Sequence, residues 1–265
     1  MSSRQHPSSP LMPVAFFGHG SPMYAIEPNR YTQAWSDFAA SIPRPKAVLM
    51  ISAHWVTRQV WVTAMDRPQT IHDFGGFPQA LFEEVYPAPG SPDLAAQVRD
   101  LLLPTSVILE EQEWGLDHGA WAILKYMYPK ADVPVVQLSL DARLSMREHY
   151  QLAKRLSGLR EQGVLILGSG NVVHNLRTVD FSSSHEFPWA HRFNDYFKKY
   201  LLANRHDPLI DALDIGEDAR LSIPTPEHYW PALYILGLQQ EHEHVKIITD
   251  GIDLASISML SFSIA

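Results

Sequence analysis

The strongest constraint on the fold is a set of continuous apolar runs that lead into glycines or histidines. Val48–Ile51 and Val164–Leu167 are apolar at every position. A strand with one solvated face alternates apolar and polar residues, whereas a strand buried on both faces does not. These runs therefore predict strands that are buried on both faces of a central sheet.

Short apolar runs alternate with amphipathic stretches along the chain, which is typical of α/β proteins. The segment 207–220 has no clear pattern. The predicted strands are Val14–Phe17, Ala47–Ser52, Val60–Met65, Ser106–Glu110, Val133–Leu138, Val164–Leu167, Val245–Thr249 and Ser256–Ile264. The predicted helices are Tyr31–Ser41, Pro92–Leu103, Gly119–Tyr128, Ser145–Gln162, Trp189–Ala203 and Glu227–Leu238.

The length of the chain allows one well-filled core, because 46% of its 265 residues are hydrophobic. No linker divides the sequence. We therefore predict one α/β domain over residues 13–265, with a central twisted mixed sheet flanked by helices. The Ser- and Pro-rich residues 1–12 are expected to form a disordered lead-in.

Composition excludes several classes of function. The net charge of −8 argues against binding nucleic acid or an anionic membrane by charge alone. The sequence has no signal-peptide core and no membrane-spanning run of about 18 apolar residues, so we expect a cytoplasmic protein. Because there are no cysteines, disulfides, thiolate zinc sites and cysteine nucleophiles are excluded. Histidine stands out, with 13 residues.

Three histidines follow predicted strands. His19, His54 and His174 come soon after the apolar runs that begin at residues 14, 47 and 164. Each alone could be a core histidine or part of a tight turn. Because sites in open α/β sheets form beyond the carboxyl ends of the strands, three such histidines together predict a shared site.

The glycines near these histidines do not form a nucleotide or hydrolase motif. Gly168-Ser-Gly170 fails the G-x-G-x-x-G pattern because Val173 stands where the third glycine would be. No G-x-S-x-G nucleophile elbow occurs around Ser21 or Ser169. Neither a dinucleotide enzyme nor a serine hydrolase is supported.

His118 is predicted to lie at the start of a helix. Asp117 can cap that helix, and a helix N-terminus lowers the pKa of an imidazole. His118 is therefore a candidate neutral acid–base group. A capping aspartate beside an exposed histidine is an equally good interpretation.

His228 is predicted to lie in the first turn of another helix. Thr225 is expected to cap this helix, with Pro226 at its first position and Glu227 favoured by the helix dipole. This interpretation does not explain His228, which is unfavourable there if charged. A neutral imidazole that binds a metal has no such conflict.

The loop Ile71–Phe77 is rich in glycine and aromatic residues and contains His72. It could line a pocket for a flat substrate, or it could be a packed loop. Histidines on separate loops, without cysteine, indicate a metal with nitrogen or mixed nitrogen and oxygen ligands. Zinc, iron and manganese are all compatible, and the H-E-x-x-H zinc motif is absent.

Six segments together resemble the class III extradiol ring-cleavage dioxygenases, and within that family the subgroup that acts on DOPA. The resemblance runs from about residue 14 to the C-terminus and keeps the motif order. The segments are Gly18-His-Gly-Ser-Pro22, Ser52-Ala-His-Trp55, Ile71-His-Asp-Phe-Gly-Gly-Phe-Pro78, Asp117-His-Gly119, Gly170-Asn-Val-Val-His-Asn175 and Pro224-Thr-Pro-Glu-His228.

The resemblance implies roles for particular side chains. His118 is implied to be an acid–base residue. His174 is implied to be either a further metal ligand or the acid–base residue beside the metal. The implied metal ligands are His19, His54 and His228, and the residues expected to bind substrate are His72, Phe74 and Ser21.

The implied cofactor is one divalent metal per chain. Many extradiol enzymes bind Fe²⁺ with two histidines and one carboxylate, whereas here the third position is His228, with Glu227 beside it. Because an all-histidine set also suits zinc, we expect Zn²⁺ in the purified protein and Fe²⁺ for turnover.

The implied reaction is the O₂-dependent opening of a catechol ring, with L-DOPA converted to 4,5-seco-DOPA. Small catechols and O₂ are thus the expected partners. Two alternatives remain. One is a zinc hydrolase that uses a metal-bound hydroxide, and the other is a non-catalytic metal-binding adaptor. The presence of both His118 and His174 argues against the adaptor.

Overall fold

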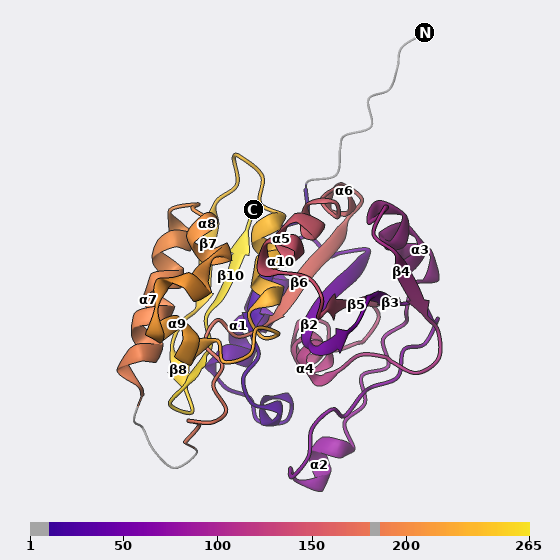
Figure 1. Cartoon of the computed structure of the whole chain (residues 1–265). Helices are drawn as coiled ribbons and strands as arrows, with labels where there is room; N and C mark the ends of the chain where they lie inside the picture. The colour runs from indigo at the N-terminus through magenta and orange to yellow at the C-terminus, as the bar shows by residue number, and fades with distance from the viewer. Residues whose placement is uncertain (1–10, 181–185) are drawn as a thin grey trace.

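A computed structural model describes residues 11–180 and 186–265, and it confirms the predicted α/β class (Figure 1). The main sheet has eight strands in the order β4-β3-β5-β2-β6-β1-β10-β7, and β8 and β9 pair separately. The strands are β1 Val14–Gly18, β2 Ala47–Thr57, β3 Val60–Thr63, β4 Val107–Glu110, β5 Val135–Asp141, β6 Val164–Gly170, β7 Val245–Thr249, β8 Ile252–Asp253, β9 Ile257–Ser258 and β10 Ser261–Ile264.

The sheet is mixed. The pairs β2–β5, β2–β6, β1–β6 and β3–β4 are parallel, whereas β3–β5, β1–β10 and β10–β7 are antiparallel. The described helices are η1 Pro22–Ala25, α1 Arg30–Ser41, α2 Gln79–Phe82, α3 Pro92–Leu101, α4 His118–Met127, α5 Met146–Lys154, α6 Gly158–Glu161, α7 Pro188–Leu202, α8 Asp207–Ile210, η2 Ala212–Ile215, α9 Glu217–Ser222 and α10 Trp230–Gly237.

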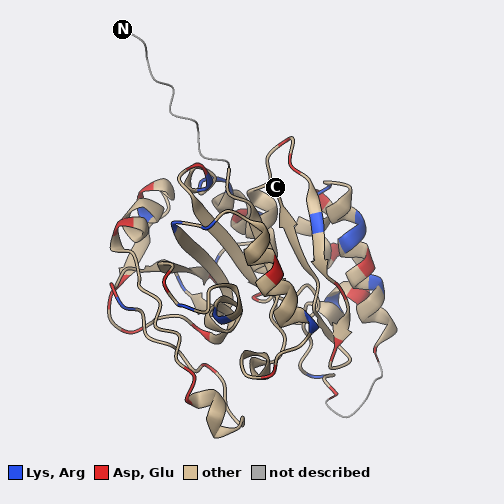
Figure 2. Ribbon diagram, turned by 180° about the vertical axis from the view of Figure 1, so that it is seen from behind, with Lys and Arg blue, Asp and Glu red and all other residues tan. Residues whose placement is uncertain are grey.

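Helices cover both faces of the sheet, as the continuous apolar strands predict (Figure 1). The helices α3, α5, α7 and α10 pack on one face, and α1 and α4 pack on the other. Lys, Arg, Asp and Glu are scattered over the outer helices and loops, with both signs side by side (Figure 2). Among the described residues, no helix is both long enough and apolar enough to cross a membrane.

Two predicted elements are divided in the structure. The predicted helix Ser145–Gln162 is interrupted by a turn over residues 155–157 between α5 and α6, and both Ser157 in this turn and Gly158 at the start of α6 are poor helix formers. The predicted strand Ser256–Ile264 becomes β9 and β10, because β9 pairs with β8 and β10 pairs with β1 and β7.

The start of the chain is held to the core at Met12, which the sequence placed in the lead-in. Met12 is buried, its N–H donates to the Arg160 carbonyl at 3.2 Å, and its own carbonyl accepts from the Arg160 guanidinium at 2.7 Å. Residues 1–10 of the predicted lead-in lie outside the described residues.

Candidate metal centre

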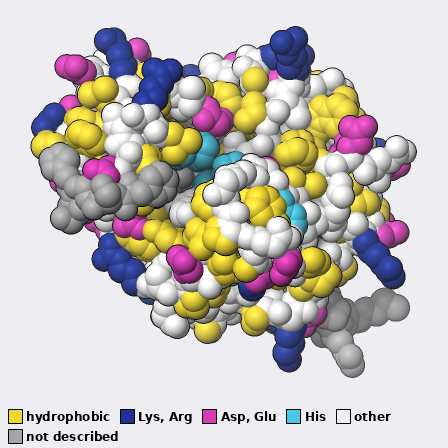
Figure 3. All heavy atoms as spheres, turned by 90° about the horizontal axis from the view of Figure 1, so that it is seen from below, with side chains coloured by type: hydrophobic (Ala, Val, Ile, Leu, Met, Phe, Trp, Pro, Cys, Tyr) yellow, Lys and Arg dark blue, Asp and Glu magenta, His cyan; other side chains and the backbone are white. Residues whose placement is uncertain are grey.

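Histidines from separate segments line one cavity of about 290 Å³. The cavity lies at the edge of the sheet where the parallel strands β1, β2 and β6 have their carboxyl ends. Histidine side chains are visible in a hollow on this face (Figure 3). The histidines that line the cavity are His19, His54, His118, His174 and His228.

His19 follows β1 and is held by the neighbouring strand β6. Its backbone N–H donates to Gly170 at 3.4 Å, and its Nδ1 is hydrogen-bonded to the Ser169 hydroxyl at 2.9 Å. The chain then turns at Gly20, whose φ of 64° favours glycine. The turn places the imidazole over the end of the sheet.

His54 lies inside β2, although the predicted strand ended at Ser52. The strand continues to Thr57, and its pairing with β5 shifts register between Ile51 and Val56. Such an irregularity changes the direction of side chains and is common next to active sites. The Nε2 atom of His54 lies 3.1 Å from Nε2 of His19.

His118 is the first residue of α4, which begins one residue before the predicted start at Gly119. Asp117 caps the helix by accepting from the Ala120 N–H at 3.2 Å. The Asp117 carboxylate is buried and also accepts hydrogen bonds from Ser52 and Gln137. The start of α4 is therefore anchored to the sheet.

The prediction for the segment before α10 was wrong. The helix begins at Trp230, so Thr225 does not cap it, and its hydroxyl donates instead to Glu227 at 2.8 Å. The His228 carbonyl accepts from the Asn171 N–H at 2.9 Å, which holds the segment against the end of β6 as a loop.

His174 lies in the segment after β6. Its N–H donates to the Ser222 carbonyl at 2.8 Å. Its ring stacks on His228 with the centroids 3.5 Å apart and an interplanar angle of 6°. It is less deeply buried than His228, so it lies on the open side of the cluster.

Three of the rings form a nearly equilateral triangle. The ring centroids are 4.9 Å apart for His19 and His54, 5.1 Å for His54 and His228, and 5.4 Å for His19 and His228. His118 is an alternative to His228 as the third metal ligand, because ligand nitrogens of His19, His54 and His118 lie within 4.8 Å of one another.

The rings are oriented by partners on the outer side of the cluster. In His19, His54 and His228 it is Nδ1 that contacts a partner, namely Ser169, Asp73 and Glu227 respectively. The Nε2 atom of each ring is therefore free to bind a metal at the centre of the cluster. Metal-binding histidines use their second nitrogen in the same way.

Burial keeps most of these imidazoles neutral. Desolvation, followed by the neighbouring imidazoles, lowers the pKa of His19 well below its usual value, and desolvation and His174 do so for His228. Burial also lowers the pKa of His118 and of His174 to about 4. For His118 the main cause is therefore burial, whereas the sequence had pointed to the helix start.

His54 behaves differently. Burial lowers its pKa, but the hydrogen bond to Asp73 and the charges of Asp117 and Asp73 outweigh burial and raise it. Metal ions require deprotonated ligands, so neutral imidazoles with free Nε2 atoms suit a divalent cation. Two nitrogens that are each about 2.0–2.1 Å from one zinc ion can stand about 3 Å apart, and those of His19 and His54 are 3.1 Å apart.

The rest of the cavity wall is mostly apolar. Ser21, one of the residues expected to bind substrate, belongs to the wall. His72 and Phe74 do not line the cavity, because they pack with Phe82 and Trp121 in an aromatic cluster behind His118. The apolar part of the wall comes from Pro22, Phe77, Leu176, Val179, Leu254 and Ile257.

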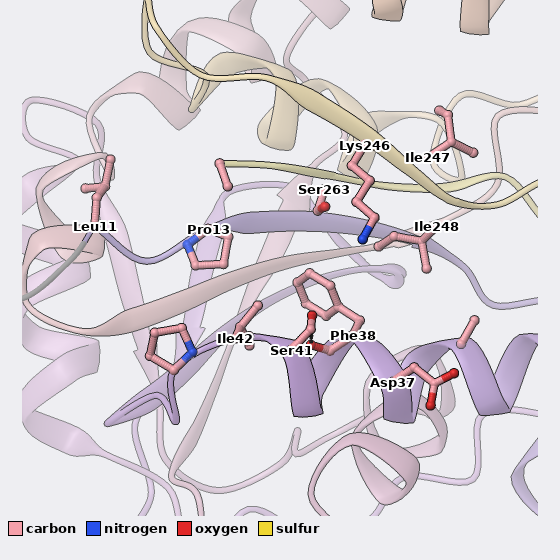
Figure 4. Close-up of a pocket in the computed structure, with 13 residues that line it drawn as sticks. Leu11, Pro13, Asp37, Phe38, Ser41, Ile42, Lys246, Ile247, Ile248 and Ser263 are labelled. Carbon is pink, nitrogen blue, oxygen red and sulfur yellow. Dashed lines mark hydrogen bonds between the residues drawn. The ribbon is translucent and has the colours of Figure 1, made fainter.

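A larger hollow of about 630 Å³ lies elsewhere, between α1 and the strands β7 and β10 (Figure 4). Its walls include Phe38, Ile42 and Ile248, and its charged side chains are Asp37 and Lys246. None of the described residues that line this hollow is a histidine. Size alone therefore does not mark the functional site.

The carboxylate of Asp73 also belongs to the cluster, although it was not predicted from the sequence. Its Oδ2 atom lies 3.0 Å from Nδ1 of His54 and 2.9 Å from Nδ1 of His118. A signal was present, since Asp73 lies next to His72 in the loop singled out above. Nothing in the sequence indicates that this loop contacts His54 and His118, which lie 19 and 45 positions away from Asp73.

The fold and the cluster define a class of protein. A family model described as the catalytic LigB subunit of aromatic ring-opening dioxygenase matches residues 13–262. The chain belongs to this family of extradiol ring-opening dioxygenases.

Known relatives extend over almost the whole chain. It is 49% identical over 262 residues to the 4,5-DOPA dioxygenase extradiol of Escherichia coli (strain K12), which covers 97% of this chain and 96% of the relative. The Beta vulgaris 4,5-DOPA dioxygenase extradiol is 36% identical over 253 residues, or 93% and 94% of the two chains. The crystal structure of the uncharacterized protein JW3007 from Escherichia coli K12 has a TM-score of 0.84 and 44% identity, covering 96% of this chain and 100% of the other.

Proposed function

We propose that this dioxygenase opens the ring of L-DOPA by 4,5-extradiol cleavage, using O₂, to give 4,5-seco-DOPA. The names of the Escherichia coli and Beta vulgaris relatives support this substrate. The observation that carries the proposal is the single cavity in which five imidazoles meet under an otherwise mostly apolar wall. A flat ring fits such a wall, and its two hydroxyls can face the imidazoles.

The metal belongs at the triangle of His19, His54 and His228. These rings are nearly equidistant, and their Nδ1 atoms are all occupied by protein partners. Fe²⁺ bound there would hold the catechol oxygens beside O₂ and couple their electronics. Zn²⁺ suits the same three nitrogens and would be the metal found after purification.

His174 and His118 are proposed to move protons. A pKa of about 4 keeps each ring neutral at pH 7, so each can accept a proton. His174 lies on the open side of the cluster and would take a proton from a catechol hydroxyl. His118 would accept the second catechol proton at Nε2 and return it as the ring opens. A positioned acid–base group typically contributes about 10²- to 10⁴-fold to a rate.

The cavity also indicates how DOPA would lie. Its wall contains no Lys, Arg, Asp or Glu among the described residues. The charged amino-acid group of DOPA would therefore point out of the cavity, past Leu176, which is 68% exposed at the rim. The ring would pack against Phe77 and Ile257, and Ser21 could contact a hydroxyl.

The test is anaerobic reconstitution with Fe²⁺ followed by O₂ and a panel of catechols. We expect O₂ uptake with L-DOPA and a yellow product of extradiol cleavage, and none of either with the Zn²⁺-loaded protein. A chain that hydrolyses esters or amides with Zn²⁺ and consumes no O₂ with any catechol would instead support the zinc hydrolase.

A further inference from the structure

One carboxylate serves two histidines of the cluster. Asp73 lies in the loop between β3 and α2, and its side chain is 13% exposed. Its Oδ2 atom lies within hydrogen-bond distance of Nδ1 of both His54 and His118, at 3.0 and 2.9 Å. Its Oδ1 atom accepts the backbone N–H of His118 at 2.8 Å. The carboxylate is therefore fixed at both oxygens.

This arrangement sets the protons on both rings. An ionised carboxylate only accepts hydrogen bonds, so His54 and His118 must each present Nδ1–H to it. Each ring then has a lone pair on Nε2. Three N–H groups converge on Asp73, two from the rings of His54 and His118 and one from the His118 backbone, and hydrogen bonds to a carboxylate favour its charged form.

We propose that Asp73 is a positioning residue shared by the metal ligand His54 and the acid–base residue His118. Loss of its charge would disturb metal binding and proton transfer together. The effect on metal binding does not depend on the reaction, whereas the effect on proton transfer rests on the proposed function.

The other side chains that contact an Nδ1 atom of the cluster do not fix the tautomers of two rings. The Ser169 hydroxyl can either donate to His19 or accept from it, so it does not force one tautomer. Glu227 contacts Nδ1 of only one ring, that of His228, at 3.2 Å. Among the described residues, only the Asp73 carboxylate contacts Nδ1 of two rings of the cluster.

The test is Asp73→Asn, which keeps the shape of the side chain and removes its charge. Because the backbone N–H of His118 can only donate, the amide oxygen is expected to take the place of Oδ1, and the NH₂ group then faces Nδ1 of both rings in place of Oδ2. Both histidines must then change tautomer and turn an Nε2–H toward the centre. We expect the dissociation constant for Zn²⁺ to rise about 10- to 100-fold, as for other outer partners of metal ligands.

Histidine nitrogen NMR of the metal-free protein gives a second readout. Wild type should show His54 and His118 both protonated at Nδ1, and Asp73→Asn should show both of them protonated at Nε2. With Fe²⁺ and saturating catechol, kcat should fall in Asp73→Asn by more than KM rises. The matched control is Asp66→Asn, an exposed carboxylate outside the cavity, which should leave every readout unchanged.

A folded Asp73→Asn variant with wild-type Zn²⁺ affinity and unchanged tautomers would overturn the proposal. If that variant does not fold, Asp73→Glu keeps the charge on a longer arm and should retain both Nδ1–H tautomers, and loss of them there would also overturn it. A changed Zn²⁺ affinity in a protein that opens no catechol would leave Asp73 as a positioning residue and refute only the proposed function.

Discussion

At the scale of single residues, the cluster shows which features a sequence can reveal. Histidines that follow apolar runs are visible in the sequence, and His19, His54 and His174 do meet in one cavity. Their partners are not visible, because Ser169 lies 150 residues from His19 and Asp73 lies 45 residues from His118. Both pairs depend on the tertiary structure and not on neighbouring positions in the sequence.

Substitutions should separate the metal ligands from the proton carriers. His228→Ala should lose metal, because it removes one corner of the ligand triangle. His118→Ala and His174→Ala should keep metal and lose about 10²- to 10⁴-fold in catechol-dependent O₂ uptake. Metal analysis and an oxygen electrode on the three purified variants measure both quantities.

The opposite pattern would change the assignment. Metal retained in His228→Ala and lost in His118→Ala would move the third ligand to His118, whose nitrogen is also within reach of His19 and His54. Loss of metal in His174→Ala would make His174 a ligand. Wild-type O₂ uptake in His174→Ala would refute both roles for it.

At the scale of elements, the apolar strands were the most predictable. The prediction for β7 matches the structure at both ends, and β1 and β4 differ by one residue at one end. The start of α10 was not predictable from the residues of its own segment. The sequence of Thr225 and Pro226 is favourable for the start of a helix. The contact between His228 and the end of β6 nevertheless keeps this segment out of α10.

That contact requires glycine at the end of β6. A Cβ atom on Gly170 would lie 2.2 Å from the His228 carbonyl oxygen. Gly170→Ala should therefore push the His228 loop outward, weaken metal binding, and cost about 1–3 kcal/mol of unfolding free energy, as overpacking typically does. Urea unfolding of the metal-free protein and Zn²⁺ titration measure the two effects.

The matched control is Gly158→Ala at the start of α6. An added Cβ there meets no atom within 4 Å. Because alanine favours helix over glycine by up to about 1 kcal/mol, this variant should be as stable as wild type or slightly more stable. Equal metal affinity in Gly170→Ala and wild type would show that His228 is not positioned by this contact.

At the scale of the whole molecule, the sequence predicted the α/β class but not the order of the strands. Apolar runs such as Val164–Leu167 show that a strand is buried, and they contain no information about which strand lies beside it. The structure places β6 between β1 and β2. That order brings the ends of β1 and β6 and the irregular part of β2 together, and it creates the site.

Gathering the imidazoles in a buried cluster has a consequence for the stability of the whole domain. His118 and His174 have pKa values of about 4 in the folded protein, against about 6.5 in an unfolded chain. Between these values the unfolded chain binds more protons, so stability falls as the pH falls from about 6.5 to 4. Asp117 acts in the opposite direction, because burial raises its pKa to about 6.

The metal-free protein should therefore lose stability on acidification. His19 and His228 add to His118 and His174, and these four histidines outnumber Asp117 and His54, whose raised pKa values act in the opposite direction, so the four determine the sign. Each extra proton bound by the unfolded chain contributes a slope of about 1.4 kcal/mol per pH unit. Urea unfolding in the presence of a chelator, from pH 7.5 to 4.5, measures the slope. His118→Gln should make it shallower, because it removes one titrating imidazole from the cluster. A midpoint that stays constant or rises as the pH falls would show that these imidazoles are not held neutral by burial in the folded chain.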